Sequence, residues 1–140
     1  MLTDILQKIG FIEKFKNFTH LSNCRENIST TDLDTLLDIL KKINPEAKYF
    51  KKEKFFRLVI KKESRIFWIH IEVSPCINFM FYEMTEKGKY IDGFPMTALY
   101  RKLKNGDISG LGTLYYCSYP EFEKIINSGY ALCKEIINAY

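Results

Sequence analysis

The chain has 140 residues, 46% of them hydrophobic and 15% aromatic, and its formal net charge is +4. This composition excludes a disordered chain, and the length is that of one domain whose core needs no disulfides. No apolar run approaches the roughly 20 residues of a membrane span, and residues 1–8 lack the basic-then-apolar order of a secretory signal. We therefore expect a cytoplasmic protein in which residues 1–140 form a single domain.

Two helices are predicted before any strand. Residues 2–18 carry apolar side chains at helical spacing, although Gly10 weakens the middle of this helix by up to about 1 kcal/mol. A polar loop over residues 19–29 follows. Thr30 or Thr31 is then expected to cap a second helix, which an Asn-Pro pair stops after residue 43. Its apolar stripe is the clearest amphipathic pattern in the chain: Leu33, Leu36, Leu37, Leu40 and Ile43.

Residues 48–92 are predicted to form an antiparallel β-meander. Segments 55–60 and 66–73 are rich in β-branched and aromatic residues, and a tight turn at Glu63 and Ser64 separates them. Pro75 cannot donate to a strand ladder and marks the next turn, while Gly88 suits a hairpin between residues 82–85 and 90–92. The register places apolar residues opposite one another: Ile60 and Phe67, Leu58 and Ile69, Phe56 and Ile71, then Val73, Ile71 and Ile69 with Ile77, Phe79 and Phe81.

The opposite face of the meander has less ordinary contents. The same register places Arg57 across from His70, Trp68 from Tyr82, and Glu72 from Asn78, with Phe55, Val59 and Met80 beside them. Such an aromatic surface with a few polar groups is typical of a partner or ligand site. A helix could instead cover it, with the polar groups paired internally. The first interpretation predicts these partner-binding residues: Arg57, Trp68, His70, Glu72 and Tyr82.

The C-terminal third completes an α+β fold. A short helix over residues 96–103 is expected to end at Gly106, and a flexible connection without phosphate-loop spacing leads to a strand over residues 113–117. Ser118 and Glu121 fit a capping box that opens a long helix through residue 140. The predicted fold is therefore an antiparallel β-meander of four to five strands, with two N-terminal helices, a short internal helix and a long C-terminal helix.

Positive charge is concentrated in the first hairpin. Seven basic and two acidic residues lie within residues 51–65, a local charge of +5. The side chains that could face an anionic partner, in addition to Arg57, are Lys51, Lys52, Lys54, Lys61, Lys62 and Arg65. Aromatic residues interleave with these lysines, so nucleic-acid binding by stacking and phosphate contacts is one interpretation. The other is a solvated hairpin whose lysines protect an edge strand from aggregation.

The sequence predicts no catalytic, metal or cofactor site. Its four cysteines are widely spaced, without a Cys-x-x-Cys pair, and are expected to be buried free thiols. His70 and Glu72 share a strand face and could support acid–base chemistry or bind a small ligand, but no nucleophile is positioned beside them. Glu83 and Asp92, nearly opposite in the last hairpin, are expected to be solvent-facing charges.

The order of these elements carries a resemblance. An α+β domain of this size, with two leading helices, a meander such as residues 55–82 and a closing helix such as residues 120–140, resembles small bacterial immunity proteins. Those proteins neutralise the toxin domains of contact-dependent or polymorphic toxin systems. The resemblance covers the whole chain in outline and carries over no individual residue. It implies tight, non-catalytic binding of a toxin domain, and the basic charge of this chain implies an acidic partner surface or a toxin that is not a nuclease.

Overall fold

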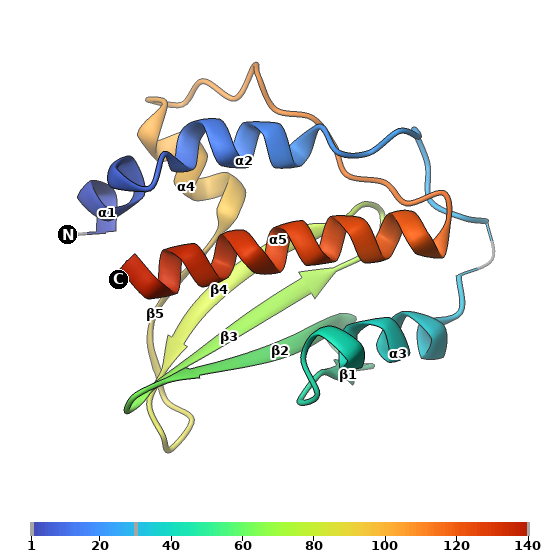
Figure 1. Cartoon of the computed structure of the whole chain (residues 1–140), viewed down its shortest axis with the longest axis horizontal. Helices are drawn as coiled ribbons and strands as arrows, with labels where there is room; N and C mark the ends of the chain where they lie inside the picture. Colours follow the sequence, from blue (N-terminus) through green and yellow to red (C-terminus); the bar gives the residue numbers. More distant parts are fainter. Residues whose placement is uncertain (1, 30, 140) are drawn as a thin grey trace.

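The computed structural model describes residues 2–29 and 31–139, and within them it has five helices and one five-stranded sheet. In chain order these elements (Figure 1) are α1 (Leu2–Lys8), α2 (Phe11–Thr19), α3 (Leu33–Ile43), β1 (Lys48–Phe50), β2 (Phe55–Lys62), β3 (Arg65–Glu72), β4 (Asn78–Met84), β5 (Tyr90–Pro95), α4 (Met96–Leu103) and α5 (Tyr119–Ala139). The strands lie in sequence order, and each pairs antiparallel with the next. The predicted α+β class, the meander and the long closing helix are confirmed.

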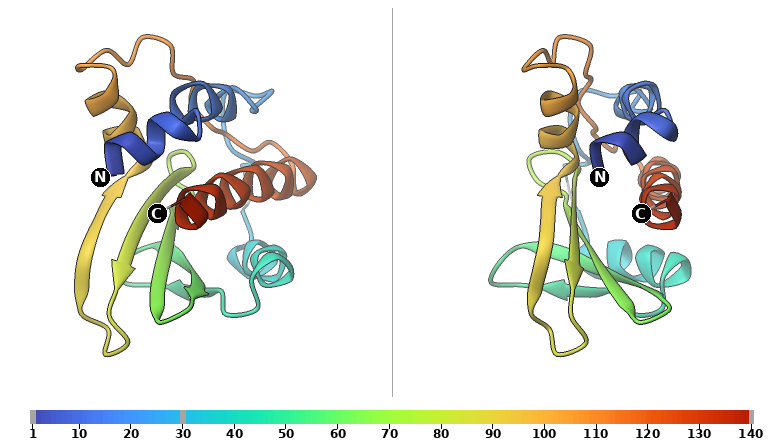
Figure 2. Two further views of the ribbon diagram at one scale, coloured as in Figure 1. Left: turned by 60° about the vertical axis from the view of Figure 1, so that its left-hand side comes forward. Right: turned by 90° about the vertical axis from the view of Figure 1, so that its left-hand side faces the viewer.

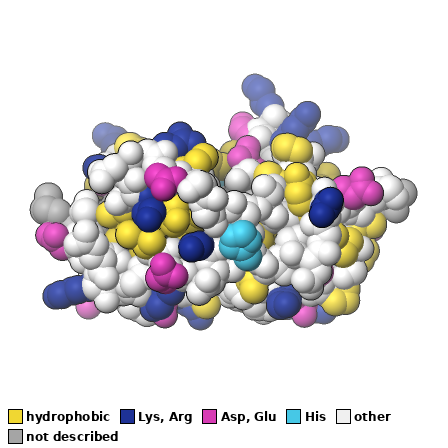
Figure 3. Space-filling model, turned by 90° about the horizontal axis from the view of Figure 1, so that it is seen from above, with side chains coloured by type: hydrophobic (Ala, Val, Ile, Leu, Met, Phe, Trp, Pro, Cys, Tyr) yellow, Lys and Arg dark blue, Asp and Glu magenta, His cyan; other side chains and the backbone are white. Residues whose placement is uncertain are grey.

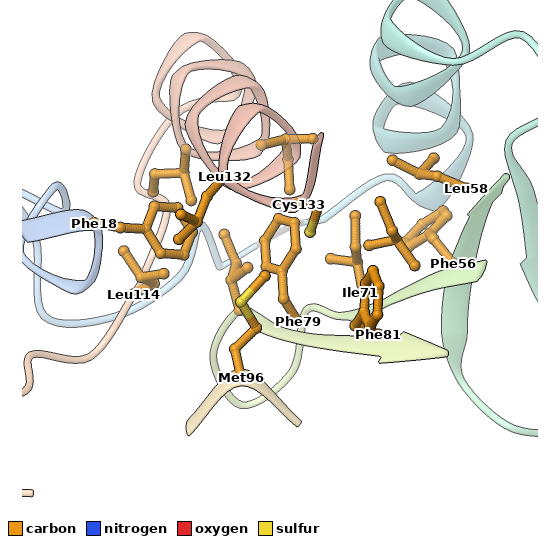
Figure 4. Packing of buried hydrophobic residues seen from close by; sticks show 14 of the residues in the cluster. Phe18, Phe56, Leu58, Ile71, Phe79, Phe81, Met96, Leu114, Leu132 and Cys133 are labelled. Atoms are coloured by element: carbon orange, nitrogen blue, oxygen red, sulfur yellow. The ribbon is translucent and has the colours of Figure 1, made fainter. Parts of the chain in front are cut away.

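The domain has two layers, because the helices gather on one face of the sheet. Both views in Figure 2 show α1, α2, α3 and α5 on the same side of the strands, while α4 continues beyond the end of β5. Alternate residues of the central strands point toward these helices and are at most 4% exposed: Phe56, Leu58, Phe67, Ile69, Ile71, Phe79 and Phe81. Figure 4 shows Phe79 directed from β4 toward Cys133 of α5. The core therefore lies between the sheet and α5.

The strand register is the one that the sequence predicts. Leu58 pairs with Ile69, and Ile69 pairs in turn with Phe81, so the apolar residues of three strands share the core face. The β2–β3 turn occupies residues 63 and 64, with Glu63 at φ 57°, and Gly88 takes φ 80° in the next hairpin. A one-residue slip would expose this whole apolar set, which explains why its pattern specifies the register.

The prediction of one helix over residues 2–18 is wrong. Gly10 adopts φ 69° and ψ 37°, a left-handed conformation that ends α1 and precedes α2. Phe11 and Phe15 of α2, four residues apart on one helix face, stack with ring centroids 5.3 Å apart, and both rings are buried in the core. Glycine thus separates two helices where the apolar spacing alone predicts one.

The predicted cap of the second helix is also wrong. Asp32 caps α3, because its carboxylate accepts from the backbone N of Asp34 at 3.0 Å and from the hydroxyl of Thr35 at 2.9 Å. Thr31 instead places its hydroxyl 3.1 Å from that of Tyr116, and Thr30 lies outside the described residues. At the other end, the helix stops as predicted at Asn44.

Residues 113–117 do not form the predicted strand. This segment runs as an irregular connection that meets its neighbours through single backbone bonds: the carbonyl of Leu114 accepts from Ile77 at 2.8 Å, and that of Tyr116 from Ile28 at 2.9 Å. Leu114 and Tyr116 are both buried in the core. The segment therefore has the alternating burial of a strand without a strand to pair with.

None of the described helices has the length and apolar character that crossing a bilayer would require.

Candidate functional site

The sheet face turned away from the helices is termed the outer face. The register brings the five predicted partner-binding side chains onto it together, and each is half-buried: Arg57, Trp68, His70, Glu72 and Tyr82. The alternative that a helix covers these residues does not describe this fold, since α1, α2, α3 and α5 lie on the other side of the sheet (Figure 2). Their partial burial comes from packing against one another.

Arg57 is the centre of the outer face. Its guanidinium carbon lies 3.5 Å from the centroid of the Trp68 ring and 4.2 Å from that of Phe50, so the cation is held between two aromatic faces. Its Nε donates to Nε2 of His70 at 3.0 Å. Three neighbours, one on β1 and two on β3, therefore fix one long side chain in a single position. This arrangement removes rotamer freedom that an exposed arginine would otherwise lose on binding.

A row of aromatic rings crosses all five strands beside Arg57. The ring centroids of Phe50 and Phe55 lie 5.3 Å apart. The rings of Phe55 and His70 are stacked with centroids 4.0 Å apart, and the centroid of His70 lies 4.9 Å from that of Tyr82. Tyr90 of β5, 59% exposed, extends the row at 6.2 Å from Tyr82. Sequence reasoning placed Phe55 on this face but missed Phe50 and Tyr90. Phe50 and Tyr90 could have been placed on this face only from the pairing of β1 with β2 and of β5 with β4. The residue pattern specifies those two pairings weakly.

Gly93 of β5 explains how Tyr82 lies on the sheet. A Cβ at residue 93 would collide with Cδ1 of the Tyr82 ring and would lie 2.7 Å from the backbone oxygen of Phe81. The absence of a side chain thus leaves space for the tyrosine ring over β5, an arrangement in which an aromatic side chain covers a strand glycine. The Tyr82 hydroxyl points toward the sulfur of Met80, 3.5 Å away.

The electrostatics of the outer face favour a neutral histidine. Burial and, to a smaller extent, the charge of Arg57 together lower the pKa of His70 to about 4. Burial also lowers the pKa of Arg57, which nearby Glu53 opposes. The pKa of Tyr82 is raised by burial, then by Tyr90 and Glu72. At neutral pH, His70 therefore uses Nε2 to accept from Arg57 and holds its proton on Nδ1.

This geometry gives little support to catalysis by His70. Its accepting nitrogen is already bonded to Arg57, so taking a proton from a substrate would cost that bond. Cys24 lies away from the outer face and is a poor nucleophile, because burial and hydrogen bonds to Cys117 and Glu121 raise its pKa to about 12. A cavity of about 260 Å³ lies between α2, β4 and the segment 108–114, and neither His70 nor Glu72 lines it.

The six basic side chains predicted to face an anion do not form one surface. Lys61 lies 3.7 Å from Glu46, and Lys62 donates to two backbone carbonyls at the end of α5, at 3.2 and 3.1 Å. Arg65 forms an ion pair with Glu83. The three that remain exposed together lie in the turn between β1 and β2, at the edge of the outer face: Lys51, Lys52 and Lys54.

The prediction that Glu83 is solvent-facing is wrong. Its side chain lies on the core face at the end of β4, and the residue is 8% exposed. Arg65 forms a bidentate ion pair with it, with Nε 2.9 Å from Oε2 and Nη2 3.1 Å from Oε1. The charge is paired because an unpaired carboxylate at this depth would be costly. Asp92, its partner in the β4–β5 register, is exposed as expected.

The cysteines also differ from expectation, since all four are free but only Cys133 is buried.

Comparisons with protein-family models, with curated proteins and with solved structures find no match to this chain. Its function is therefore inferred from the geometry of the outer face and from the charges around it.

Proposed function

We propose that this protein is a non-catalytic protein-binding module whose partner docks on the outer face, around Arg57 and Trp68. The observation that carries the proposal is the Arg57 guanidinium held between Trp68 and Phe50 on a sheet face that α1, α2, α3 and α5 leave uncovered. Tryptophan, tyrosine and arginine are the residues most enriched at interface hot spots, and here they lie together. Their mutual packing fixes them before any partner arrives.

The charges beside this surface indicate the chemistry of the partner. Lys51, Lys52 and Lys54 extend from the β1–β2 turn at its edge, with Glu53 as the one acidic residue among them. A partner with an acidic patch next to an apolar contact would be steered to this edge and held by the aromatic row. Figure 3 shows that basic and acidic side chains interleave over the face of the molecule that carries α2 and α4.

Within this proposal, the partner is a toxin domain and the protein is its immunity protein in the cytoplasm. The support is the α+β outline, which resembles that of such proteins, together with the preformed contact surface around Arg57 and Trp68. Inhibition would be steric: the outer face covers the toxin's active site, or holds the toxin in an inactive form. Electrostatic attraction to the lysine turn would speed the encounter without determining its lifetime.

Co-expression with a toxin domain encoded by the adjacent upstream gene tests this proposal. We expect the wild-type protein to restore growth, and Arg57→Ala or Trp68→Ala to lose that protection while remaining folded. Lys134→Ala is the matched control, because it also removes a cation over an aromatic ring, 5.0 Å from Tyr130, but on α5 and away from the outer face. Full protection by the two outer-face variants would overturn the proposal.

Nucleic-acid binding is a second candidate, favoured by one observation: Phe50 and Phe55 flank the turn that carries the exposed lysines. Bases could stack on these rings while the lysines contact phosphates. Binding of a single-stranded RNA oligonucleotide that weakens steeply with salt, and that is lost when Lys51, Lys52 and Lys54 are replaced together by Ala, would favour this candidate over protein binding.

A further inference from the structure

Two cysteines that lie far apart in the sequence meet at one carboxylate. Cys24 follows α2, Cys117 precedes α5, and Glu121 is in the first turn of α5. The thiol of Cys24 donates to Oε1 of Glu121 at 2.9 Å, and the thiol of Cys117 donates to the same oxygen at 3.4 Å. One ligand atom from each residue lies within 4.8 Å of the other two. Figure 1 shows the segment after α2 descending beside the start of α5.

The surrounding hydrogen bonds fix these three side chains. The carboxylate of Glu121 also accepts from the backbone N of Cys117 at 3.2 Å and from that of Asn23 at 3.3 Å. The hydroxyl of Ser22 donates to the carbonyl of Tyr115 at 2.7 Å, which ties the two cysteine-bearing segments together. The Ser118 half of the predicted capping box is present, since its hydroxyl accepts from the backbone N of Glu121 at 3.2 Å. The Glu121 carboxylate, in contrast, is held toward both sulfurs.

We propose that Cys24, Cys117 and Glu121 form a binding site for a thiophilic divalent cation, with Zn²⁺ as the best fit. On binding, two sulfur–metal bonds and one oxygen–metal bond form, and each thiol releases one proton to solvent. Two sulfurs and one carboxylate oxygen match the donors that zinc prefers, whereas magnesium and calcium prefer oxygen alone. Tetrahedral zinc with S and O ligands at its usual distances needs neighbouring ligands about 3.5 Å apart. The present separations of 2.9 and 3.4 Å need only a small outward movement.

The fourth ligand of such a site is water. Cys117 is exposed, and a cavity lined by Cys24, Cys117 and residues 25–29 opens next to the two sulfurs. Bound metal would fasten the loop after α2 to the start of α5, two segments that no regular secondary structure joins. Sequence spacing gave no sign of this site, because the two cysteines are 93 positions apart and the ligands meet only in the fold. The inference does not depend on the proposed protein-binding function.

Calorimetric titration of the reduced, metal-free protein with Zn²⁺ alone tests this site, with Co²⁺ as a spectroscopic substitute. We expect one ion per chain, thiolate-to-cobalt charge-transfer absorption, and a higher unfolding midpoint when Zn²⁺ is present. Cys24→Ser and Cys117→Ser should each weaken binding by at least about tenfold, since each removes one of three protein ligands. Cys76→Ser is the control and should bind as the wild type does, because Cys76 lies outside the cluster.

Three results would overturn the inference. These are no Zn²⁺ binding by the wild type, equal affinity in Cys117→Ser and the wild type, and cobalt bound without charge-transfer absorption. A Cys24–Cys117 disulfide found by mass spectrometry in protein that fails to bind Zn²⁺ when reduced would also overturn it, and would assign the pair to redox chemistry. Cys117 is exposed, so its serine variant should fold, and urea unfolding of that variant checks this.

Discussion

Phe67 and Trp68 are neighbours in β3 that point to opposite faces of the sheet, so their alanine variants separate the core from the outer face. Phe67 is completely buried, and its ring stacks on that of Phe81 with centroids 5.4 Å apart. Replacing a buried phenylalanine by alanine costs about 3–5 kcal/mol of unfolding free energy, through lost transfer energy and the cavity left behind. Phe67→Ala should therefore leave the domain close to unfolded.

Trp68→Ala should cost much less. Trp68 is half-buried, and its loss removes the contact with Arg57, about 1 kcal/mol for a partly exposed cation–π pair, together with part of its apolar burial. In this variant Arg57 keeps its contacts with Phe50 and His70, so the Arg57 charge does not lose all of its partners. We expect a total loss of about 1–2 kcal/mol for Trp68→Ala.

Urea unfolding followed by far-ultraviolet circular dichroism measures both variants. Circular dichroism is needed because Trp68 is the only tryptophan of the chain, so its replacement removes the fluorescence signal. The slope of free energy against urea should be unchanged if the native state keeps its compactness. A loss in Trp68→Ala equal to that in Phe67→Ala would show that both residues are core and would refute the outer-face assignment.

Three further predictions test the packing and charge of the fold. His70 should titrate near pH 4 by NMR, and its pKa should rise in Arg57→Ala because a nearby positive charge is removed. Asn44→Ala should cost about 1–3 kcal/mol in urea unfolding, because the amide donates to a β2 carbonyl at 2.7 Å and to a tyrosine hydroxyl of α5 at 3.0 Å. Gly129→Ala should cost about 1–2 kcal/mol, despite better helix propensity, since its Cβ would meet the buried ring of Phe79.

The His70 pKa also predicts how stability depends on pH. The folded pKa of about 4 lies below the ordinary value of 6.5, so the unfolded state binds more protons between these two pH values. Stability should be fully present above about pH 6.5 and fall as the pH is lowered toward 4. After allowance for solvent screening of a partly exposed ring, the expected loss is about 1–2 kcal/mol. A titration near pH 6.5 would contradict this environment for His70.

Controls for the other two variants lie close to them in the chain. Asn138→Ala changes an exposed asparagine at the end of α5 and should alter stability by less than about 0.5 kcal/mol. Ser128→Ala, next to Gly129 in α5, should be neutral or slightly stabilising because alanine has the higher helix propensity. A Gly129→Ala variant as stable as Ser128→Ala would contradict the close packing of α5 on Phe79.

The sheet could be predicted from the sequence because the features that specify its strands and turns lie close together along the chain. Phe56 and Leu58 alternate with polar or half-buried neighbours, short turns join the strands, and a wrong register would expose every apolar residue at once. The same parity, read from the sequence alone, places Arg57, Trp68 and His70 together on the outer face. Period, parity and turn length were sufficient for these residues.

The features that sequence reasoning missed depend on tertiary contacts. Gly10 could weaken a helix or break it, and the apolar spacing of residues 2–18 does not distinguish the two outcomes. The sequence around Glu83 predicts an exposed charge near a turn, because the ion pair with Arg65 cannot be seen from it. The apolar alternation of residues 113–117 predicts a strand, but in the fold this segment has no partner strand. Cys24 and Cys117 carry no local signal, since only the docking of α5 brings them together.

The dissociation constant of the complex with the proposed toxin-domain partner, measured by calorimetry for the wild type, Arg57→Ala and Lys134→Ala, tests the protein-binding role of the outer face most directly. If Arg57 is a hot spot worth about 2 kcal/mol, its replacement should raise the dissociation constant by about 30-fold. Lys134→Ala, on the helical side, should change it by less than about twofold. Equal affinities for all three proteins would contradict the assignment of the outer face as the docking surface.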